Sequence, residues 1–325
     1  MIDVITGNCM EVLKGIENES ISCCITSPPY YGLRDYGIDG QIGQEKTPEQ
    51  YIEQLVKVFR EVRRILRKDG TLWVNIGDSY AGSMQGIGGA GSEPSKQDTN
   101  RGHLEMKKSG KKSVTANLCG YKPKDLIGIP WMLAFALRND GWYLRQDIIW
   151  SKPNAMPESV KDRCTKSHEY IFLFSKNKNY YFDHKAMQET AVNDAVSTRE
   201  NPPRYGGKKY TETPDEFYRT KSGNAYAYTG RRNRRDVWNI STQPCTDAHF
   251  AVFPEKLVEP CILAGSKEGD TVLDPFGGSG TTGVVANRLF RNAILIELNP
   301  KYANMARNRT NQIGLSDVMF GGVTE

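Results

Sequence analysis

The chain has 325 residues, of which 38% are hydrophobic and 25% are charged, so it is large enough for one big globular α/β domain or two smaller ones. Its net charge is only +5, no apolar run approaches the roughly 18 residues of a membrane span, and the first residues lack the order of a signal peptide. The seven cysteines are scattered without Cys-x-x-Cys spacing and the four histidines are not grouped with them, so we expect a reducing, cytoplasmic protein without metal sites.

The N-terminal part alternates short apolar runs with one strong helical pattern. Strands are predicted at 2–5, 21–25 and 71–76. Thr47 and Pro48 begin an amphipathic helix as a capping box with proline at the first helical position, and Gly70 is expected to end it. Residues 81–117, rich in Gly, Ser and Lys, lack a pattern and predict a mobile loop or insertion.

The same rhythm resumes further along the chain. Predicted elements are a helix at 124–139, strands near 143–150 and 169–175, a helix at 254–264, a strand at 271–274, a glycine turn with a helix, and a strand at 293–297. Such alternation is typical of a mostly parallel sheet with helices on both faces. The segment 186–240 interrupts it.

The stretch TSPPYYGL, residues 26–33, directly follows the strand predicted at 21–25. Two consecutive prolines fix their own φ angles, carry no N–H group and push the preceding residues out of the helical region. The stretch is therefore a stiff turn that presents carbonyls, a hydroxyl and an aromatic ring. An ordinary strand-ending turn with a packed tyrosine is the simpler interpretation, and this stretch alone does not decide.

The stretch VLDPFGGSGTTG, residues 272–283, places glycines 278, 280 and 283 between a predicted strand and a predicted helix, with Glu297 at the end of the next strand. This context is typical of a turn that holds a nucleoside cofactor, and NAD is one candidate. Only 42 residues follow Gly283, too few for a dinucleotide array, and Asp274 would oppose a pyrophosphate. A carboxylate there suits a cationic cofactor such as S-adenosylmethionine.

With SPPY near its start and DPFGGSGTT near its end, the chain resembles the DNA methyltransferases that methylate exocyclic amines, in the permuted order in which the catalytic motif precedes the cofactor motif. Further landmarks are GTLWVNIGDSY, IIWSKPN, HEYIFLFSK, HFAVFPEKL and ILIELNPKY. The resemblance covers nearly the whole chain outside 81–120 and 186–240. It implies a Rossmann-like α/β fold with a doubly wound, mostly parallel sheet and an inserted target-recognition region.

The resemblance also implies roles for matching residues. The methionine side of S-adenosylmethionine would be lined by Asp274, Phe276, Gly277, Gly278 and Gly280. Glu297 would hold the ribose, Phe253 would pack near the methionine end, and Asn8 stands where the family often has an acid that contacts the adenine. The catalytic turn would be Ser27, Pro28, Pro29 and Tyr30, with Tyr30 stacked on a base flipped out of the duplex.

The expected reaction is methyl transfer to the N4 amine of cytosine, because serine at position 27 usually accompanies cytosine in this family and aspartate accompanies N6 of adenine. Adenine N6 remains the alternative, and a catalytically idle DNA-binding protein with the same fold is an alternative of another class. An RNA or protein methyltransferase is a weaker one. Methylation at cytosine C5 would need a thiolate, and Cys245 and Cys261 are expected to be structural.

The expected organisation is a catalytic half at 1–185, a target-recognition region at 186–240 and a cofactor-binding half at 241–325. Within 199–235, ten Lys/Arg stand against four acids among six aromatic residues, a composition that favours a nucleic-acid surface. The predicted DNA-binding residues are Arg231, Arg232, Arg234 and Arg235, and the basic run 101–113 is the competing candidate. The expected partners are duplex DNA and, in a bacterial, archaeal or phage setting, a cognate restriction endonuclease.

Overall fold

The computed structural model describes residues 1–33, 38–82, 120–190, 217–219, 225–227, 231–243 and 253–320. The chain divides into two compact units: the first combines residues 1–182 and 236–325, and the second consists of residues 183–235. Within the described ranges, no helix has the length and apolar character needed to cross a membrane.

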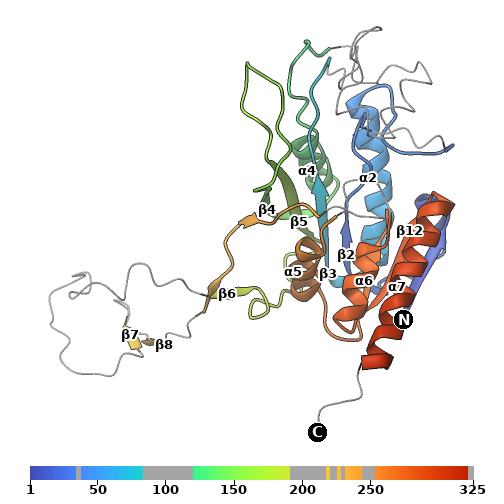
Figure 1. Cartoon of the computed structure of the whole chain (residues 1–325), viewed down its shortest axis with the longest axis vertical. Coiled ribbons are helices and arrows are strands. Elements are labelled where there is room, and N and C mark those ends of the chain that lie inside the picture. The colour runs from blue at the N-terminus through green and yellow to red at the C-terminus, as the bar shows by residue number, and fades with distance from the viewer. Residues whose placement is uncertain are drawn as a thin grey trace, which may run out of the picture. The chain divides into compact units, whose positions relative to one another are not determined.

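The first unit is built on an eight-stranded sheet with the order β1-β12-β11-β2-β3-β5-β4-β10 (Figure 1). The strands are β1 (Ile2–Thr6), β2 (Ile21–Thr26), β3 (Leu66–Ile76), β4 (Tyr143–Ser151), β5 (His168–Ser175), β10 (Val237–Asn239), β11 (Thr271–Asp274) and β12 (Asn292–Glu297). Neighbours are parallel from β1 through β3, whereas β5 runs antiparallel to both β3 and β4. The predicted mostly parallel sheet is confirmed, and β11 from the C-terminal part lies beside β2 from the N-terminal part.

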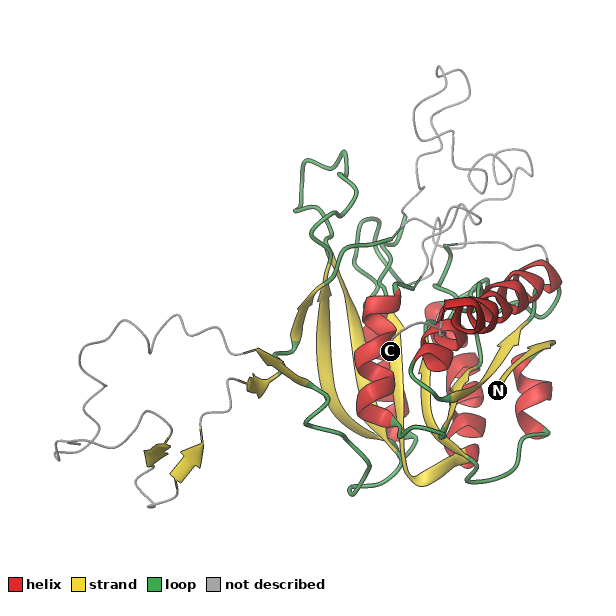
Figure 2. Ribbon diagram, turned by 60° about the horizontal axis from the view of Figure 1, so that its bottom comes forward, coloured by secondary structure: helices red, strands yellow, loops and turns green. Residues whose placement is uncertain are grey.

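Helices flank both faces of this sheet (Figure 2). They are α1 (Cys9–Lys14), α2 (Pro48–Ile65), α4 (Ile129–Asn139), α5 (Glu255–Gly265), α6 (Thr281–Arg288) and α7 (Pro300–Phe320). Successive residues of a strand point to opposite faces. Cys24 accordingly belongs to the core formed with α2 and α4, while Cys23 lies against Gly265 of α5. All six residues of β2 are therefore buried, as expected of a strand covered on both sides.

Two predicted boundaries were wrong for local reasons. The Thr47 hydroxyl accepts from the Gln50 amide at 3.3 Å as predicted, but α2 ends at Ile65 and Gly70 lies inside β3. The pairing of β2 with β3 shifts between Ile21 and Cys23, so residues 67–70 bulge from the strand instead of extending the helix. Helix α4 begins at Ile129, after the left-handed Gly128, and not at 124.

The second unit contains two short antiparallel pairs among its described residues. Strand β6 (Gln188–Thr190) pairs with β9 (Arg231–Asn233), and β7 (Phe217–Arg219) pairs with β8 (Ala225–Ala227). The unit covers most of the predicted recognition region. The predicted loop at 81–117 falls almost entirely in residues 83–119, outside the described ranges.

Helix α7 packs against the start of α6 at Gly280, and this contact yields a stability prediction. Gly280 has φ of 85°, and a Cβ added there would lie 2.8 Å from Cβ of Ala306. Gly269 has a similar φ of 80° but open space around it. Gly280→Ala should lower the free energy of unfolding by about 2–5 kcal/mol, the sum of backbone strain and overpacking. Gly269→Ala should cost only about 1–2 kcal/mol from the strain. Equal losses in urea unfolding would mean that α7 does not press on this turn.

Candidate functional site

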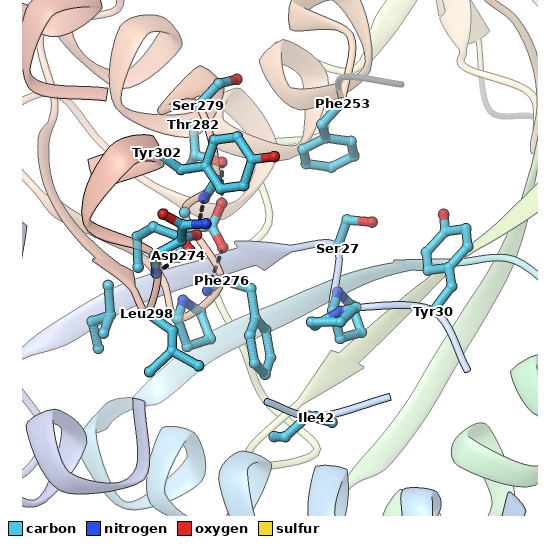
Figure 3. Close-up of a pocket in the computed structure, with 18 of the residues that line it drawn as sticks. Ser27, Tyr30, Ile42, Phe253, Asp274, Phe276, Ser279, Thr282, Leu298 and Tyr302 are labelled. Carbon is cyan, nitrogen blue, oxygen red and sulfur yellow. Dashed lines mark hydrogen bonds between the residues drawn. The ribbon is translucent and has the colours of Figure 1, made fainter. Parts of the chain in front are cut away.

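A cleft of about 290 Å³ opens at the carboxyl ends of β1, β2, β11 and β12 (Figure 3). Ligands of open α/β sheets bind at this edge, because the loops that leave parallel strands meet there. The cleft brings together all predicted catalytic residues and most predicted cofactor residues: Asn8, Ser27, Pro28, Pro29, Tyr30, Phe253, Asp274, Phe276, Gly277, Gly278 and Glu297. Gly280 is not among the lining residues. It caps α6 and allows the close approach of Ala306 described above.

Glu297 supports the glycine turn from the end of β12. Its two carboxylate oxygens accept hydrogen bonds from the amides of Gly278 and Asn299, each at 2.8 Å. Burial raises the pKa of this carboxyl above its ordinary value, and the two amide donors counteract the rise. A Cβ on Gly277 would lie 3.0 Å from Cβ of Leu295, so a side chain here would crowd the approach of the turn to β12.

The chemistry of this end of the cleft fits an adenosine-containing ligand. The aliphatic side chains of Ile42 and Leu298 and the rings of Phe276 and Tyr302 line the cleft (Figure 3), and Glu297, which directly precedes Leu298, lines it as well. Aromatic and aliphatic walls suit a purine ring, and a partly buried carboxylate suits the hydroxyls of a ribose. Asn8 also lines the cleft, where its Oδ1 accepts from the Met10 amide at 2.9 Å and thereby caps α1.

Asp274 is almost fully buried and is held by the chain itself. Its Oδ1 accepts from the Thr26 hydroxyl at 2.6 Å and the Phe276 amide at 3.1 Å, and its Oδ2 accepts from the Thr282 hydroxyl at 2.7 Å. Burial raises the pKa of the carboxyl, while these donors act in the opposite direction. Asp274 therefore joins the glycine turn to Thr26, the last residue of β2, which directly precedes Ser27.

The Ser-Pro-Pro-Tyr turn is held from two neighbouring elements. The Tyr51 hydroxyl on α2 donates to the carbonyl of Pro29 at 2.8 Å, and the Ser27 hydroxyl donates to Oδ1 of Asn75 at 3.4 Å. Among the described residues, no group donates to the carbonyl of Pro28. The turn thus carries one carbonyl oxygen and one hydroxyl oxygen on neighbouring residues that both line the cleft.

Tyr30 is fixed at its hydroxyl, which donates to Oε2 of Glu169 at 2.7 Å and lies 3.2 Å from Oδ1 of Asn75. Burial, followed by the charge of Glu169, raises the pKa of Tyr30 well above its ordinary value, so the side chain remains a neutral phenol. A Cβ on Gly77 would lie 2.7 Å from Cε2 of Tyr30. The ring is therefore packed against bare backbone of the residue that follows β3.

Sequence reasoning missed a polar group beneath this turn. Asn75 on β3, Glu169 on β5 and Lys152 after β4 all line the cleft, and Lys152 forms an ion pair with Glu169 while its Nζ lies 4.2 Å from the centre of the Trp150 ring. These residues lie in recognised motifs, WVNIG, HEYIF and IIWSKPN. An amide inside an otherwise apolar strand was the available signal.

Cys261 and His168 lie away from the cleft. Cys261 is buried inside α5, where its thiol donates to the carbonyl of Leu257, so it is structural as expected. His168 packs its ring edge-on against Tyr170 and does not line the cleft. Cys245 falls outside the described ranges. In those ranges, no group of three or more His, Cys, Asp or Glu side chains is placed to hold a metal ion.

The four predicted DNA-binding arginines lie in or next to β9 of the second unit. Arg232 and Arg235 both direct Nε to Oε1 of Glu189 on the paired strand β6, at 2.9 and 3.2 Å. Arg235 is exposed and Arg232 is half-buried. One carboxylate therefore holds two of the four guanidinium groups in place.

Comparisons with known proteins agree on one family. A family model described as DNA methylase matches residues 21–308. The chain is 47% identical to the type II methyltransferase M.SmaI of Serratia marcescens over 94% of its own length and 89% of the relative. It is 46% identical to the type II methyltransferase M.Cfr9I of Citrobacter freundii over 93% and 85% of the two chains.

Solved structures share the fold at lower sequence identity. The PvuII DNA methyltransferase (cytosine-N4-specific) superposes with a TM-score of 0.60 at 20% identity, covering 95% of this chain and 87% of that one. A candidate DNA modification methylase of Thermus thermophilus, in complex with S-adenosyl-L-methionine, gives a TM-score of 0.56 at 22% identity and covers 96% and 94%.

The raised pKa of Glu297 predicts that binding of S-adenosylmethionine is linked to proton release. In the role expected for Glu297, ribose hydroxyls would donate to the ionised carboxylate, so binding would lower the pKa from its raised value and affinity would fall as the pH drops through that value. Calorimetry in two buffers of different ionisation enthalpy measures the released protons. Glu297→Gln should abolish the release and weaken binding about 10- to 100-fold. The exposed Glu268→Gln is the control, and proton release that persists in Glu297→Gln would exclude Glu297 as the linked group.

Proposed function

We propose that this chain, which belongs to the family of N6-adenine and N4-cytosine DNA methylases, methylates the exocyclic N4 amine of cytosine in duplex DNA. It is a DNA methyltransferase that depends on S-adenosylmethionine. The finer choice of cytosine N4 rests on Ser27, because serine at this position usually accompanies cytosine in the family. The structural neighbour described as cytosine-N4-specific has only 20% identity, and its likeness concerns the fold.

The observation that supports amine methylation most directly is the pair of oxygens on the Ser-Pro-Pro-Tyr turn. An exocyclic amine is a poor nucleophile because its lone pair is delocalised into the ring. The Ser27 hydroxyl and the Pro28 carbonyl, to which no described residue donates, can accept its two hydrogens and favour a pyramidal nitrogen. Because prolines hold these acceptors in advance, no reorganisation is needed when the base arrives.

The two ends of the cleft suit the two reactants. Tyr30 lies at the opposite end of the cleft from Leu298, with Phe276 between them (Figure 3). We assign the Tyr30 end to a base flipped out of the duplex, which stacks on the aromatic ring, and the end with Leu298 and Glu297 to the adenosine. When bound there, S-adenosylmethionine supplies an electrophilic methyl group, which is transferred in line to the amine without a covalent enzyme intermediate.

The deciding experiment identifies the methylated base. The enzyme is incubated with S-adenosylmethionine and plasmid DNA, and the DNA is digested to nucleosides for mass spectrometry. We expect N4-methylcytosine. N6-methyladenine would correct the target base, and the absence of any methylated base would support the alternative of an idle DNA-binding protein.

Ser27→Ala tests the amine contact within the same assay. The variant should keep its affinity for S-adenosylmethionine and lose about 10²- to 10³-fold in kcat, the usual cost of one preorganised hydrogen-bond partner. Ser22→Ala is the matched control, because Ser22 lies on β2, the strand that leads into Ser27, but does not line the cleft. Near-normal turnover of Ser27→Ala would reject the role of this hydroxyl.

We further propose that the second unit carries sequence recognition and that Arg231, Arg232, Arg234 and Arg235 contact the DNA. The antiparallel pair of β6 and β9 supports this assignment, because Glu189 orients two of the arginines without burying them. Guanidinium groups can bind phosphates or pair with guanine edges. A cognate restriction endonuclease acting on the same DNA sequence is the partner we expect for a chain whose relatives are type II methyltransferases.

Removing positive charge and removing negative charge from this strand pair should have opposite effects on DNA binding. Replacing the four arginines by glutamine should weaken binding and flatten the log–log salt slope by about 0.9 for each lost phosphate contact. Glu189→Gln should strengthen binding to non-specific DNA, because it frees Arg232 and Arg235 from their carboxylate. Fluorescence anisotropy at several salt concentrations measures both. If the arginine variant binds DNA as the wild type does, and neutralising the basic residues of 101–113 weakens binding, the DNA surface would be assigned to that run instead.

A further inference from the structure

The polar group beneath the catalytic turn sets the direction of its hydrogen bonds. Asn75 is only 2% exposed, and its Nδ2 donates to Oε2 of Glu169 and to the carbonyl of Tyr170, both at 3.2 Å. A carboxylate and a backbone carbonyl can accept hydrogen bonds but cannot donate them, so the nitrogen of the Asn75 amide must face these two partners. The amide oxygen consequently faces the hydroxyls of Ser27 and Tyr30, and its orientation follows from the network.

This orientation determines what Ser27 can do. The amide oxygen of Asn75 has no proton to give, so in the 3.4 Å contact between the two residues the Ser27 hydroxyl is the donor. The lone pairs of Ser27 Oγ are then left for the cleft. A reversed amide would present N–H to Ser27, turn the serine proton into the cleft and oppose the hydrogens of an incoming amine.

Glu169 is the group that prevents this reversal. Its Oε2 accepts from Tyr30 and from Asn75, while its Oε1 is paired with Lys152. The side chains of Lys152 and Glu169 are 18% and 13% exposed, so the pair is largely shielded from water. Strands β4 and β5 are already joined by a backbone ladder from Tyr143↔Ser175 to Ser151↔His168, with one register shift between Leu144 and Gln146, so their pairing does not depend on this ion pair.

We propose that Asn75 and Glu169 are positioning residues for methyl transfer: Glu169 fixes the amide of Asn75, and Asn75 fixes the Ser27 hydroxyl as an acceptor for the amine of the target base. Neither residue needs to touch the substrate for this role. The proposal rests on the proposed amine methylation and adds the residues that make Ser27 competent for it.

Asn75→Asp gives the first test, because it keeps the shape and changes one donor into an acceptor. The ionised carboxylate would oppose Oε2 of Glu169 and the carbonyl of Tyr170, whereas the protonated carboxyl can donate to Glu169 and still accept from Ser27. The charged or titratable groups that face this position are Tyr30, Glu169 and Lys152, with Lys166 acting on the Glu169–Lys152 pair. We expect kcat to be reduced about 10- to 100-fold at pH 8 and to recover as the pH falls, with KM unchanged.

The wild type and Asn177→Asp are the controls for that pH profile. Asn177 also donates its amide to a backbone carbonyl, that of Lys68, but it does not line the cleft. A pH profile of Asn75→Asp parallel to that of the wild type, or a loss confined to KM, would overturn the proposal. An inactive wild type would instead reject the proposed function itself, so the two failures are distinguishable.

A rescue experiment covers the case in which Asn75→Asp fails to fold. In Glu169→Gln the oxygen of the new amide should turn toward Lys152. The N–H groups of the new amide then face Asn75 and force the Asn75 amide to reverse. The kcat should fall about 10-fold or more. Adding Lys152→Met removes the competing donor, so the amide oxygen can return to Asn75 and the double variant should regain most of the lost kcat. A double variant no more active than Glu169→Gln would overturn the proposal.

Discussion

The hydrogen bond between Thr26 and Asp274, 2.6 Å long and fully buried, connects two parts of the chain that are 248 residues apart. A carboxylate with 3% exposure is tolerable only when its oxygens receive donors, and Thr26, Thr282 and the Phe276 amide supply them. Because Thr26 directly precedes Ser27, the same bond sets the distance between the catalytic turn and the glycine turn. The parallel pairing of β2 with β11 brings the two ends of the chain to this point.

Beyond the bond between Thr26 and Asp274, the other contacts of the site hold the Ser-Pro-Pro-Tyr turn in one position. The prolines remove backbone freedom, Tyr51 holds the carbonyl of Pro29, and the hydroxyl of Tyr30 is tied to Glu169. Because Gly77 has no side chain, the ring of Tyr30 can pack against its backbone. In the same way, Gly277 lets the glycine turn lie close to β12. A transfer between two bound reactants gains rate chiefly from such preorganisation, since atoms misplaced by about 1 Å can cost 10²-fold.

The sequence was informative where a residue type has few structural uses. Paired prolines after a strand, glycines after a strand and an acid closing the next strand each predicted a turn at the same sheet edge, and the cleft contains Ser27, Asp274 and Glu297 together. Gly280 matched the same motif, yet its geometry serves the contact with Ala306. The Asn75–Glu169–Lys152 group was missed, because the lone amide in β3 does not reveal which residues the register of β3, β5 and β4 places beside it. The end of α2 was missed because a bulge at 67–70 looks, in sequence, like the last turn of a helix.

The hydrogen-bond directions in the cleft bear on when the amine loses its proton. Before transfer, the carboxylate of Glu169 is engaged by Tyr30, Asn75 and Lys152, and Ser27 donates to a neutral amide. None of these groups is a free base, so the residues described around Ser27 favour transfer to the neutral amine first. The methylated nitrogen then carries the positive charge and is strongly acidic, so water can remove its proton without a dedicated base. The proposed reaction therefore requires no general base beside Ser27, and a neutral Asn75 beneath this hydroxyl is consistent with chemistry that depends on orientation.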